Sequence, residues 1–177
     1  MKKIITAITL GAILTGCSGA AQAVTKTTPV VEIQEQQTVN FWSASVQQTA
    51  VNKVIKKLKA RVGKTWYVFS GSTPRGWDCS GLTKWAYQQL GIEIPHSANK
   101  QARVGIKVAS PTVGDLVLFG YKGTNTYFHA AIYVGDNKFI HAGFRKGQTT
   151  KILSLTDPSV KNTKIKFVRL LPDVPVG

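Results

Sequence analysis

The residues of this chain best suited to chemistry are one cysteine and two histidines. Cys79 stands in the run Asp78-Cys79-Ser80-Gly81, whereas the second cysteine, Cys17, ends a signal-like N-terminal segment. A thiolate can attack a carbonyl carbon, and a histidine such as His129 or His141 can accept the proton of the thiol and later deliver it to a leaving amine. This combination favours nucleophilic catalysis, although a lone cysteine can also be an inert core residue.

A helix over residues 79–90 is expected to position the thiol. Its apolar residues recur at the spacing of one helix face, namely Leu82, Trp85, Ala86 and Leu90, and Gly91 supplies a stop. Cys79 then lies at the helix N-terminus, where unpaired backbone N–H groups and the helix dipole stabilise negative charge. We therefore expect a lowered pKa for Cys79 and N–H groups able to hold an oxyanion.

A hairpin is expected to bring His129 and His141 together. Gly135-Asp136-Asn137 separates two apolar runs, and a three-residue loop would pair Ala131 with His141, leaving the two histidines as diagonal neighbours on one face. A loop of two or four residues would place them on opposite faces. In the first case His129 can serve as base, with its ring within about 4 Å of the Cys79 sulfur, and His141 can orient it. The alternative is two unrelated histidines.

The N-terminus indicates export. Residues 1–16 carry two lysines and then a run without charges, which is the pattern of a signal peptide. Leu14-Thr15-Gly16-Cys17 resembles the lipobox of bacterial lipoproteins, which implies cleavage before Cys17 and its lipidation. Ser18 then resembles a signal for the outer membrane, where the host has one. Ala21-Gln22-Ala23 is a rival site that would give a secreted or periplasmic protein. Either route leaves one thiol without a disulfide partner.

The remaining sequence is expected to form a tether and one domain. Residues 17–45 lack periodicity and suit a flexible tether, and residues 46–177 have the length of one domain. We expect an α+β fold, with further helices over 47–62 and 97–103 packed on an antiparallel sheet of about five strands. The strands are expected near Leu116–Phe119, Ala130–Val134, Lys138–His141, Lys151–Leu155 and Lys164–Leu171.

The chain is strongly basic, with a formal charge of +15, and loss of Lys2 and Lys3 with the signal leaves +13. In an exported protein this charge favours anionic envelope polymers over nucleic acid, or it serves solubility alone. We expect no cofactor and a monomer. One cysteine and two histidines could bind zinc, but the sequence lacks a C-x-x-C or H-x-E spacing, so no metal site is expected.

Several separated motifs follow the order found in a known family. They are Tyr67 with Gly71, Asp78-Cys79-Ser80-Gly81-Leu82, Leu90-Gly91-Ile92 before Pro95, Gln101, the run 113–119, His129 before Ile132-Tyr133-Val134-Gly135, and Phe139-Ile140-His141-Ala142. From Val51 to Leu155 the chain resembles the NlpC family of papain-like cell-wall cysteine peptidases.

This resemblance implies a peptidoglycan endopeptidase that cleaves stem peptides, commonly between γ-D-glutamate and the diamino acid. Cys79 would be the nucleophile, His129 the general base and His141 the orienting residue. Tyr67 would position the scissile carbonyl, and Asp78 and Ser80 would bind the free amine and backbone of the stem. Those three residues could otherwise be a core aromatic and a helix cap.

Departures from the family pattern and two further functions remain open. His96 stands where arginine or lysine often follows the proline, and Ser70 replaces a frequent glycine or alanine. One further function is an amidase that cuts between muramic acid and L-alanine. The other is a catalytically silent lipoprotein that binds peptidoglycan, although the presence of Cys79, His129 and His141 argues against it.

Overall fold

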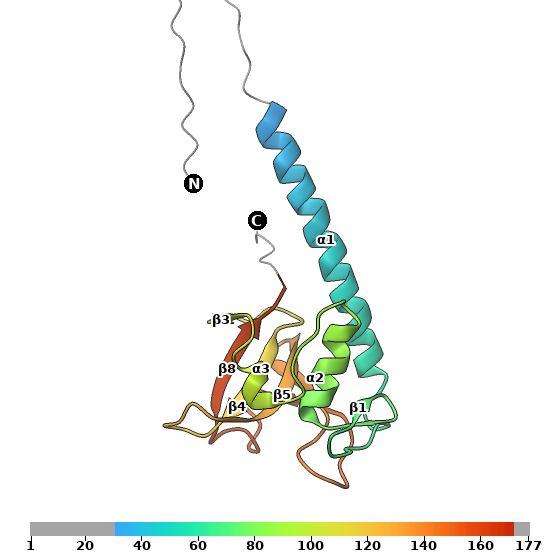
Figure 1. Cartoon of the computed structure of the whole chain (residues 1–177), viewed down its shortest axis with the longest axis vertical. Coiled ribbons are helices and arrows are strands. Elements are labelled where there is room, and N and C mark those ends of the chain that lie inside the picture. The colour runs from blue at the N-terminus through green and yellow to red at the C-terminus, as the bar shows by residue number, and fades with distance from the viewer. Residues whose placement is uncertain (1–30, 172–177) are drawn as a thin grey trace, which may run out of the picture.

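The computed structural model describes the backbone of residues 31–171 and the side chains from residue 45 onward. The expected signal peptide, the lipidation site Cys17 and the first part of the expected tether lie outside the described residues. The described chain forms helices beside a twisted antiparallel sheet (Figure 1). The α+β prediction is confirmed.

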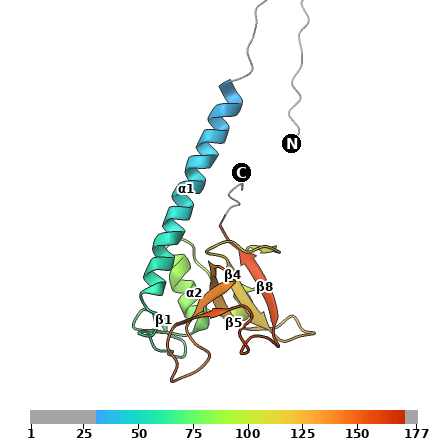
Figure 2. The same ribbon diagram turned by 180° about the vertical axis from the view of Figure 1, so that it is seen from behind.

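The helix α1 (Val31–Lys59) is longer than the sequence predicted. The sequence predicts a tether over residues 17–45 and a helix that starts at residue 47, whereas α1 begins at Val31. No proline or glycine interrupts the chain between these points, and glutamate and glutamine favour the helix, so it extends without an apolar repeat. The N-terminal half of α1 projects beyond the rest of the described chain, as Figure 1 and, from behind, Figure 2 show.

The last turns of α1 carry the apolar face that the sequence predicted. Val51, Val54, Ile55 and Leu58 are buried against Leu82 and Ala86 of α2 (Cys79–Gln88), Trp77 and the sheet residues Ile132 and Ile140. Gly63, past the end of α1, has a φ of +71°, as a glycine after a helix commonly has. The two helices therefore pack together against one face of the sheet, and this packing positions α2 beside the sheet.

The sheet has six strands in the order β3-β8-β4-β5-β6-β7, and all its pairings are antiparallel. The strands are β3 (Ile106–Val108), β4 (Leu116–Gly120), β5 (Tyr127–Gly135), β6 (Lys138–His141), β7 (Lys151–Ser154) and β8 (Lys164–Arg169). The prediction of about five strands omitted β3, an edge strand of three residues, which is too short to give a clear alternating pattern. The helix α3 (Ala98–Gln101) is shorter than the predicted 97–103.

A small hairpin of β1 (Ser72–Thr73) and β2 (Gly76–Trp77) precedes α2 and determines how the chain enters it. Trp77 is fully buried, and its indole N–H donates to the Thr150 hydroxyl at 2.8 Å. A Cβ on Gly81 would lie 1.9 Å from the Gly71 carbonyl oxygen. Only glycine at position 81 allows the first turn of α2 to pack this closely against the hairpin.

Candidate active site

Cys79 is the first residue of α2, and Asp78 is its N-cap. The Asp78 side chain accepts from the Gly81 N–H at 2.7 Å, which satisfies one of the unpaired donors at the helix end. The thiol is half-buried, and it interacts with the backbone N–H groups of Ser80 and Ala130. The contact with Ala130 places the sulfur beside the peptide bond that joins Ala130 to His129 of β5.

The electrostatics of Cys79 differ from our expectation. Burial raises the pKa of the Cys79 thiol, the backbone N–H groups of Ala130 and Ser80 lower it, and the Asp78 carboxylate raises it further. Burial is the largest of these effects, so the pKa of Cys79 lies above its ordinary value. The predicted lowering was wrong, because the sequence revealed the helix end but not the depth of the thiol or its neighbouring carboxylate.

The two histidines are hydrogen-bonded to each other. Nε2 of His129 lies 3.0 Å from Nδ1 of His141, and both side chains are buried. The pairing of Ile132 with Ile140 gives the register that the sequence predicted for a three-residue loop. The loop that produces this register is not the predicted three-residue loop, however.

A two-residue turn and a bulge produce this register. Gly135 pairs with Lys138, so that Asp136 and Asn137 form the turn with φ of +50° and +57°, and the ladder shifts between Tyr133 and Gly135. A two-residue turn alone would have put the histidines on opposite faces. The extra residue in the bulged strand restores the predicted face.

Aromatic rings enclose the histidine pair and keep it neutral. Phe144 lies with its centroid 4.4 Å from that of His129 and 4.7 Å from that of His141, and Phe119 and Phe139 also pack against the pair. Burial, and then the neighbouring His141, lower the pKa of His129 well below its usual range. Burial lowers the pKa of His141 to about 4, with Lys151 acting in the same direction. Neither ring is expected to be charged at neutral pH.

The hydrogen bond between the two rings is compatible with either nitrogen as the donor, and one of the two arrangements leaves a lone pair on Nδ1 of His129. If Nε2–H of His129 donates to Nδ1 of His141, Nδ1 of His129 carries a lone pair and His141 carries its proton on Nε2. That Nε2 atom of His141 is buried and has no hydrogen-bond partner among the described residues. The distance from the Cys79 sulfur to the His129 ring stays a prediction.

The residues expected to bind substrate lie next to Cys79. Burial raises the pKa of Tyr67, and the charges of Cys79 and Asp78 raise it further, so its hydroxyl remains a donor. The Ser80 hydroxyl donates to Asp78 at 3.0 Å, and His96 Nε2 lies 2.9 Å from the same carboxylate. In the sequence, His96 was notable only as a departure from the family pattern after Pro95. Its contact with Asp78 depends on a loop that no local pattern places.

Gln101 is a supporting residue for which the sequence suggested no role. It is fully buried; its amide donates to the carbonyls of Ser80 and Pro95 at 3.0 and 2.7 Å, and its side-chain oxygen accepts from Thr83 at 2.8 Å. It thereby ties the first turn of α2 to the loop before α3.

No group of three or more His, Cys, Asp and Glu residues in the described part of the chain is arranged to hold a metal ion.

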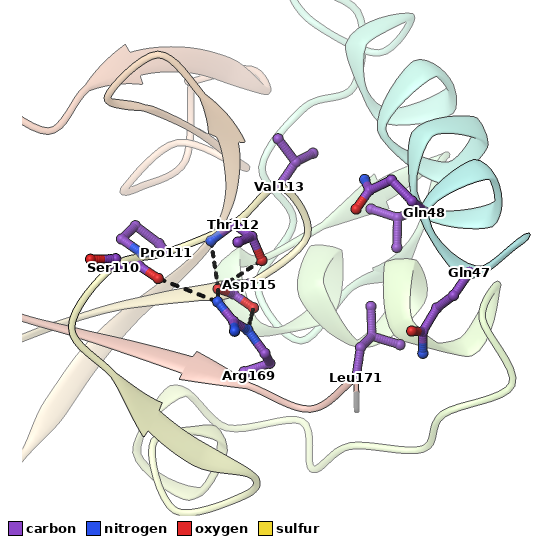
Figure 3. Close-up of a pocket in the computed structure, with 10 residues that line it drawn as sticks. Gln47, Gln48, Ser110, Pro111, Thr112, Val113, Asp115, Arg169 and Leu171 are labelled. Atoms are coloured by element: carbon purple, nitrogen blue, oxygen red, sulfur yellow. Dashed lines mark hydrogen bonds and ion pairs between the residues drawn. The ribbon is translucent and has the colours of Figure 1, made fainter. Parts of the chain in front are cut away.

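A cavity of about 420 Å³ lies away from these residues, between α1 and the end of β8 (Figure 3). Gln47 and Gln48 of α1 line one side of it. Asp115 and Arg169, which form an ion pair at 2.9 Å, line the other. The cavity contains none of the candidate catalytic residues.

None of the described helices is long and apolar enough to cross a membrane.

A cysteine at a helix end, beside a sheet that carries paired histidines, defines the class of papain-like cysteine-peptidase folds. The chain belongs to the NlpC/P60 family, whose model matches residues 63–169. Residues 1–18 match a prokaryotic membrane lipoprotein lipid attachment site, which identifies a membrane-anchored protein of the cell envelope. The sequence-based predictions of the family and of a lipoprotein are both confirmed.

Relatives and solved structures agree with this assignment. The chain is 42% identical over 110 residues to gamma-DL-glutamyl hydrolase of Bacillus subtilis (strain 168), a match that covers 60% of the chain and 26% of the relative. It is 40% identical over 118 residues to murein DD-endopeptidase MepH of Escherichia coli (strain K12), covering 62% and 42%. A NlpC/P60 family protein from Bacillus cereus ATCC 10987 superposes with a TM-score of 0.63 at 31% identity, covering 69% of this chain and 40% of that one. Each match therefore spans less than half of the protein compared.

Proposed function

We propose that this protein is a peptidoglycan hydrolase, a cysteine endopeptidase that cleaves stem peptides, with the γ-D-glutamyl–diamino acid bond as its target. The observation that carries the proposal is the 3.0 Å His129–His141 hydrogen bond beside the Ala130 N–H that contacts the Cys79 thiol. The names of the relatives, a glutamyl hydrolase and a murein endopeptidase, support this substrate class.

The first half of the reaction starts from a neutral thiol and a neutral imidazole. Nδ1 of His129 accepts the thiol proton as the Cys79 sulfur attacks the scissile carbonyl carbon and the S–C bond forms. The oxyanion is held by backbone N–H groups at the start of α2 and by the Tyr67 hydroxyl. His129, now an imidazolium, donates through Nε2–H to the neutral His141, which keeps the ring oriented.

The second half returns the proton and releases the products. When the tetrahedral intermediate collapses, the C–N bond breaks and the leaving amine takes the proton from His129 Nδ1, which leaves an acyl-enzyme on Cys79. Water then attacks the thioester carbonyl carbon and gives a proton to His129. As the new C–O bond forms, the C–S bond breaks, the carboxyl product leaves, and the Cys79 sulfur takes the proton back from His129. A pair that starts neutral needs no preformed thiolate, in agreement with the raised pKa of Cys79 and the lowered pKa of His129.

We also propose that the lipidated protein is monomeric and is held on the outer membrane where the host has one. Ser18 after the lipid attachment site supports the outer-membrane placement. The basic charge would favour contact with anionic envelope polymers. Fractionation of membranes from expressing cells tests the location, because the protein should be found with outer-membrane markers.

Digestion of purified sacculi tests the activity, with wild type compared with Cys79→Ala and product masses as the readout. The expected result is split stem peptides from wild type and none from the variant. Intact free stems would show the amidase reaction instead. Sacculi that bind the protein but release nothing would favour a binding protein, and equal release by Cys79→Ala would exclude Cys79 as the nucleophile.

A further inference from the structure

Two loops that carry exposed cations lie side by side at one end of the described chain. Backbone hydrogen bonds of 2.8 and 2.9 Å join residues 63–67, which follow α1, to residues 148–150, which lead into β7, and Trp66 pairs with Thr149. Both views of the molecule place these loops at the end opposite the projecting N-terminal half of α1 (Figures 1 and 2).

Four cations of these loops form what we call the basic end surface. They are Arg61, Lys64, Arg145 and Lys146. All four are exposed, and none has an ion pair or a side-chain hydrogen bond with another described residue. No aspartate or glutamate occurs in residues 36–77 or 137–156. The like charges therefore repel one another, and neither segment supplies a carboxylate to offset them.

Cations around the loop between β4 and β5 are, by contrast, engaged in the fold. Arg103 donates to the Asn125 carbonyl at 3.2 Å, and Lys164 donates to the Thr124 carbonyl at 2.9 Å. The basic end surface makes no such contacts among the described residues. Its charges are therefore open to a partner from solution.

Trp66 lies among these cations and points away from the catalytic cysteine. Neighbouring side chains point to opposite sides of an extended segment. Thr65 is buried and Trp66 is 58% exposed, so the indole lies on the outer side with Lys64. Tyr67, whose pKa the charge of Cys79 raises, faces the candidate active site instead. The basic end surface is therefore separate from that site, and the indole adds an apolar area to it.

Resting on the proposed function, which places the substrate in the cell wall, we propose that the basic end surface binds an anionic wall polymer of the phosphodiester class. Guanidinium groups bind phosphate oxygens in pairs, and lysines add point charges. The two non-bridging oxygens of a phosphodiester point in different directions, so donors from both loops can reach one group. Such binding would hold the enzyme beside its substrate.

The position of the surface favours a wall polymer over the membrane that holds the lipid. The lipid attachment site precedes α1 in the chain, and the basic end surface follows the other end of this helix. A helix of 29 residues spans about 43 Å. The cations are thus displaced from the start of α1 by the length of that helix.

Co-sedimentation tests this inference with the lipidated full-length protein held in phosphatidylcholine vesicles. The probes are poly(glycerol phosphate) and poly-L-glutamate with equal numbers of charges, and the readout is the dissociation constant for each at 0.15 M salt. Wild type should bind poly(glycerol phosphate) more tightly than poly-L-glutamate. The same vesicles should not cluster with phosphatidylglycerol vesicles.

Two double variants of equal net charge separate this surface from charge in general. Lys64→Gln with Lys146→Gln should weaken the binding of poly(glycerol phosphate) by roughly tenfold or more, because each cation beside an anionic surface contributes about fivefold. Lys122→Gln with Lys161→Gln removes two exposed lysines from other loops. That control should change the dissociation constant by less than about threefold, because charges farther away than about 8 Å are largely screened at this salt concentration.

The outcomes separate the binding surface from the proposed activity. Loss of binding in the first double variant alone supports the inference. No binding by wild type, equal weakening in both double variants or tighter binding of poly-L-glutamate would overturn it. Clustering with phosphatidylglycerol vesicles in place of polymer binding would make a bilayer the partner and would also overturn it. A wild type that binds the polymer but leaves sacculi undigested would overturn the proposed function and leave the binding surface standing.

Discussion

Replacing His141 with asparagine should remove much of the acid sensitivity of the folded state. His141 is fully buried, and burial lowers its pKa to about 4, assisted by Lys151 and opposed by Asp157. In the unfolded chain the imidazole has its ordinary pKa of 6.5. Below that value the unfolded state therefore binds more protons than the native state, and stability falls as the pH falls.

The size of the effect follows from the two pKa values. The contribution of His141 is fully present above pH 6.5 and declines until the pH reaches about 4, where a total of about 3 kcal/mol has been lost. About 2 kcal/mol of this loss falls between pH 7 and pH 5. His129 also contributes a loss of stability as the pH falls; burial, the first cause of its lowered pKa, acts in wild type and in the variant, whereas the smaller effect of His141 is lost in the variant.

Urea unfolding of wild type and His141→Asn at pH 7 and pH 5 measures the difference. Asparagine presents an oxygen that can accept from His129 Nε2–H, so the variant retains the orienting contact at neutral pH. The free energy of unfolding of wild type should fall by about 2 kcal/mol more than that of the variant over this pH range. If the two proteins lose stability in parallel, His141 is not a buried imidazole that stays neutral in the folded state, and the reasoning is refuted.

Three further predictions concern the start of α2. Because burial raises the pKa of Cys79, its alkylation by iodoacetamide should keep accelerating from pH 7 to about pH 9; a rate already level at pH 7 would indicate a preformed thiolate. Gly81→Ala places a methyl group 1.9 Å from the Gly71 carbonyl oxygen and should cost about 3 kcal/mol or more, measured by thermal unfolding; a cost under about 1 kcal/mol would show that the turn adapts. Ser70 has a φ of +57° and donates to Asp78 from its backbone, so Ser70→Gly should relieve strain and raise stability by up to about 1 kcal/mol; a loss on urea unfolding would contradict this.

Much of the fold could be predicted because its signals are local. The helix at Cys79 follows from the Asp78 cap and the apolar spacing after it, and β6 has the predicted bounds Lys138–His141. The edge strand β3 was missed because Ile106–Val108 pairs only with β8, which lies far along the chain. The start of α1 was missed because helix formers without an apolar repeat give no periodic signal.

The candidate site divides in the same way. The sequence identified the thiol, both histidines and the face that the histidines share. That shared face was predicted, however, on the assumption of a three-residue loop between the strands. The structure reaches it through a two-residue turn and a bulge near Val134. A bulge is stabilised by packing from both sides of a strand, so no run of residues in the hairpin reveals it.

The sequence by itself determined which chemistry the protein carries: one unpaired thiol at a helix start, two histidines in neighbouring strands and an N-terminal lipid attachment site. The tertiary structure decided the pKa values of these groups and the partners of the residues beside them. Burial raises the pKa of Cys79 and lowers those of the histidines, and a distant loop brings His96 Nε2 within 2.9 Å of the Asp78 carboxylate. Desolvation and long-range contacts depend on atoms brought together from distant segments, whereas caps and periodicity are written in neighbouring residues.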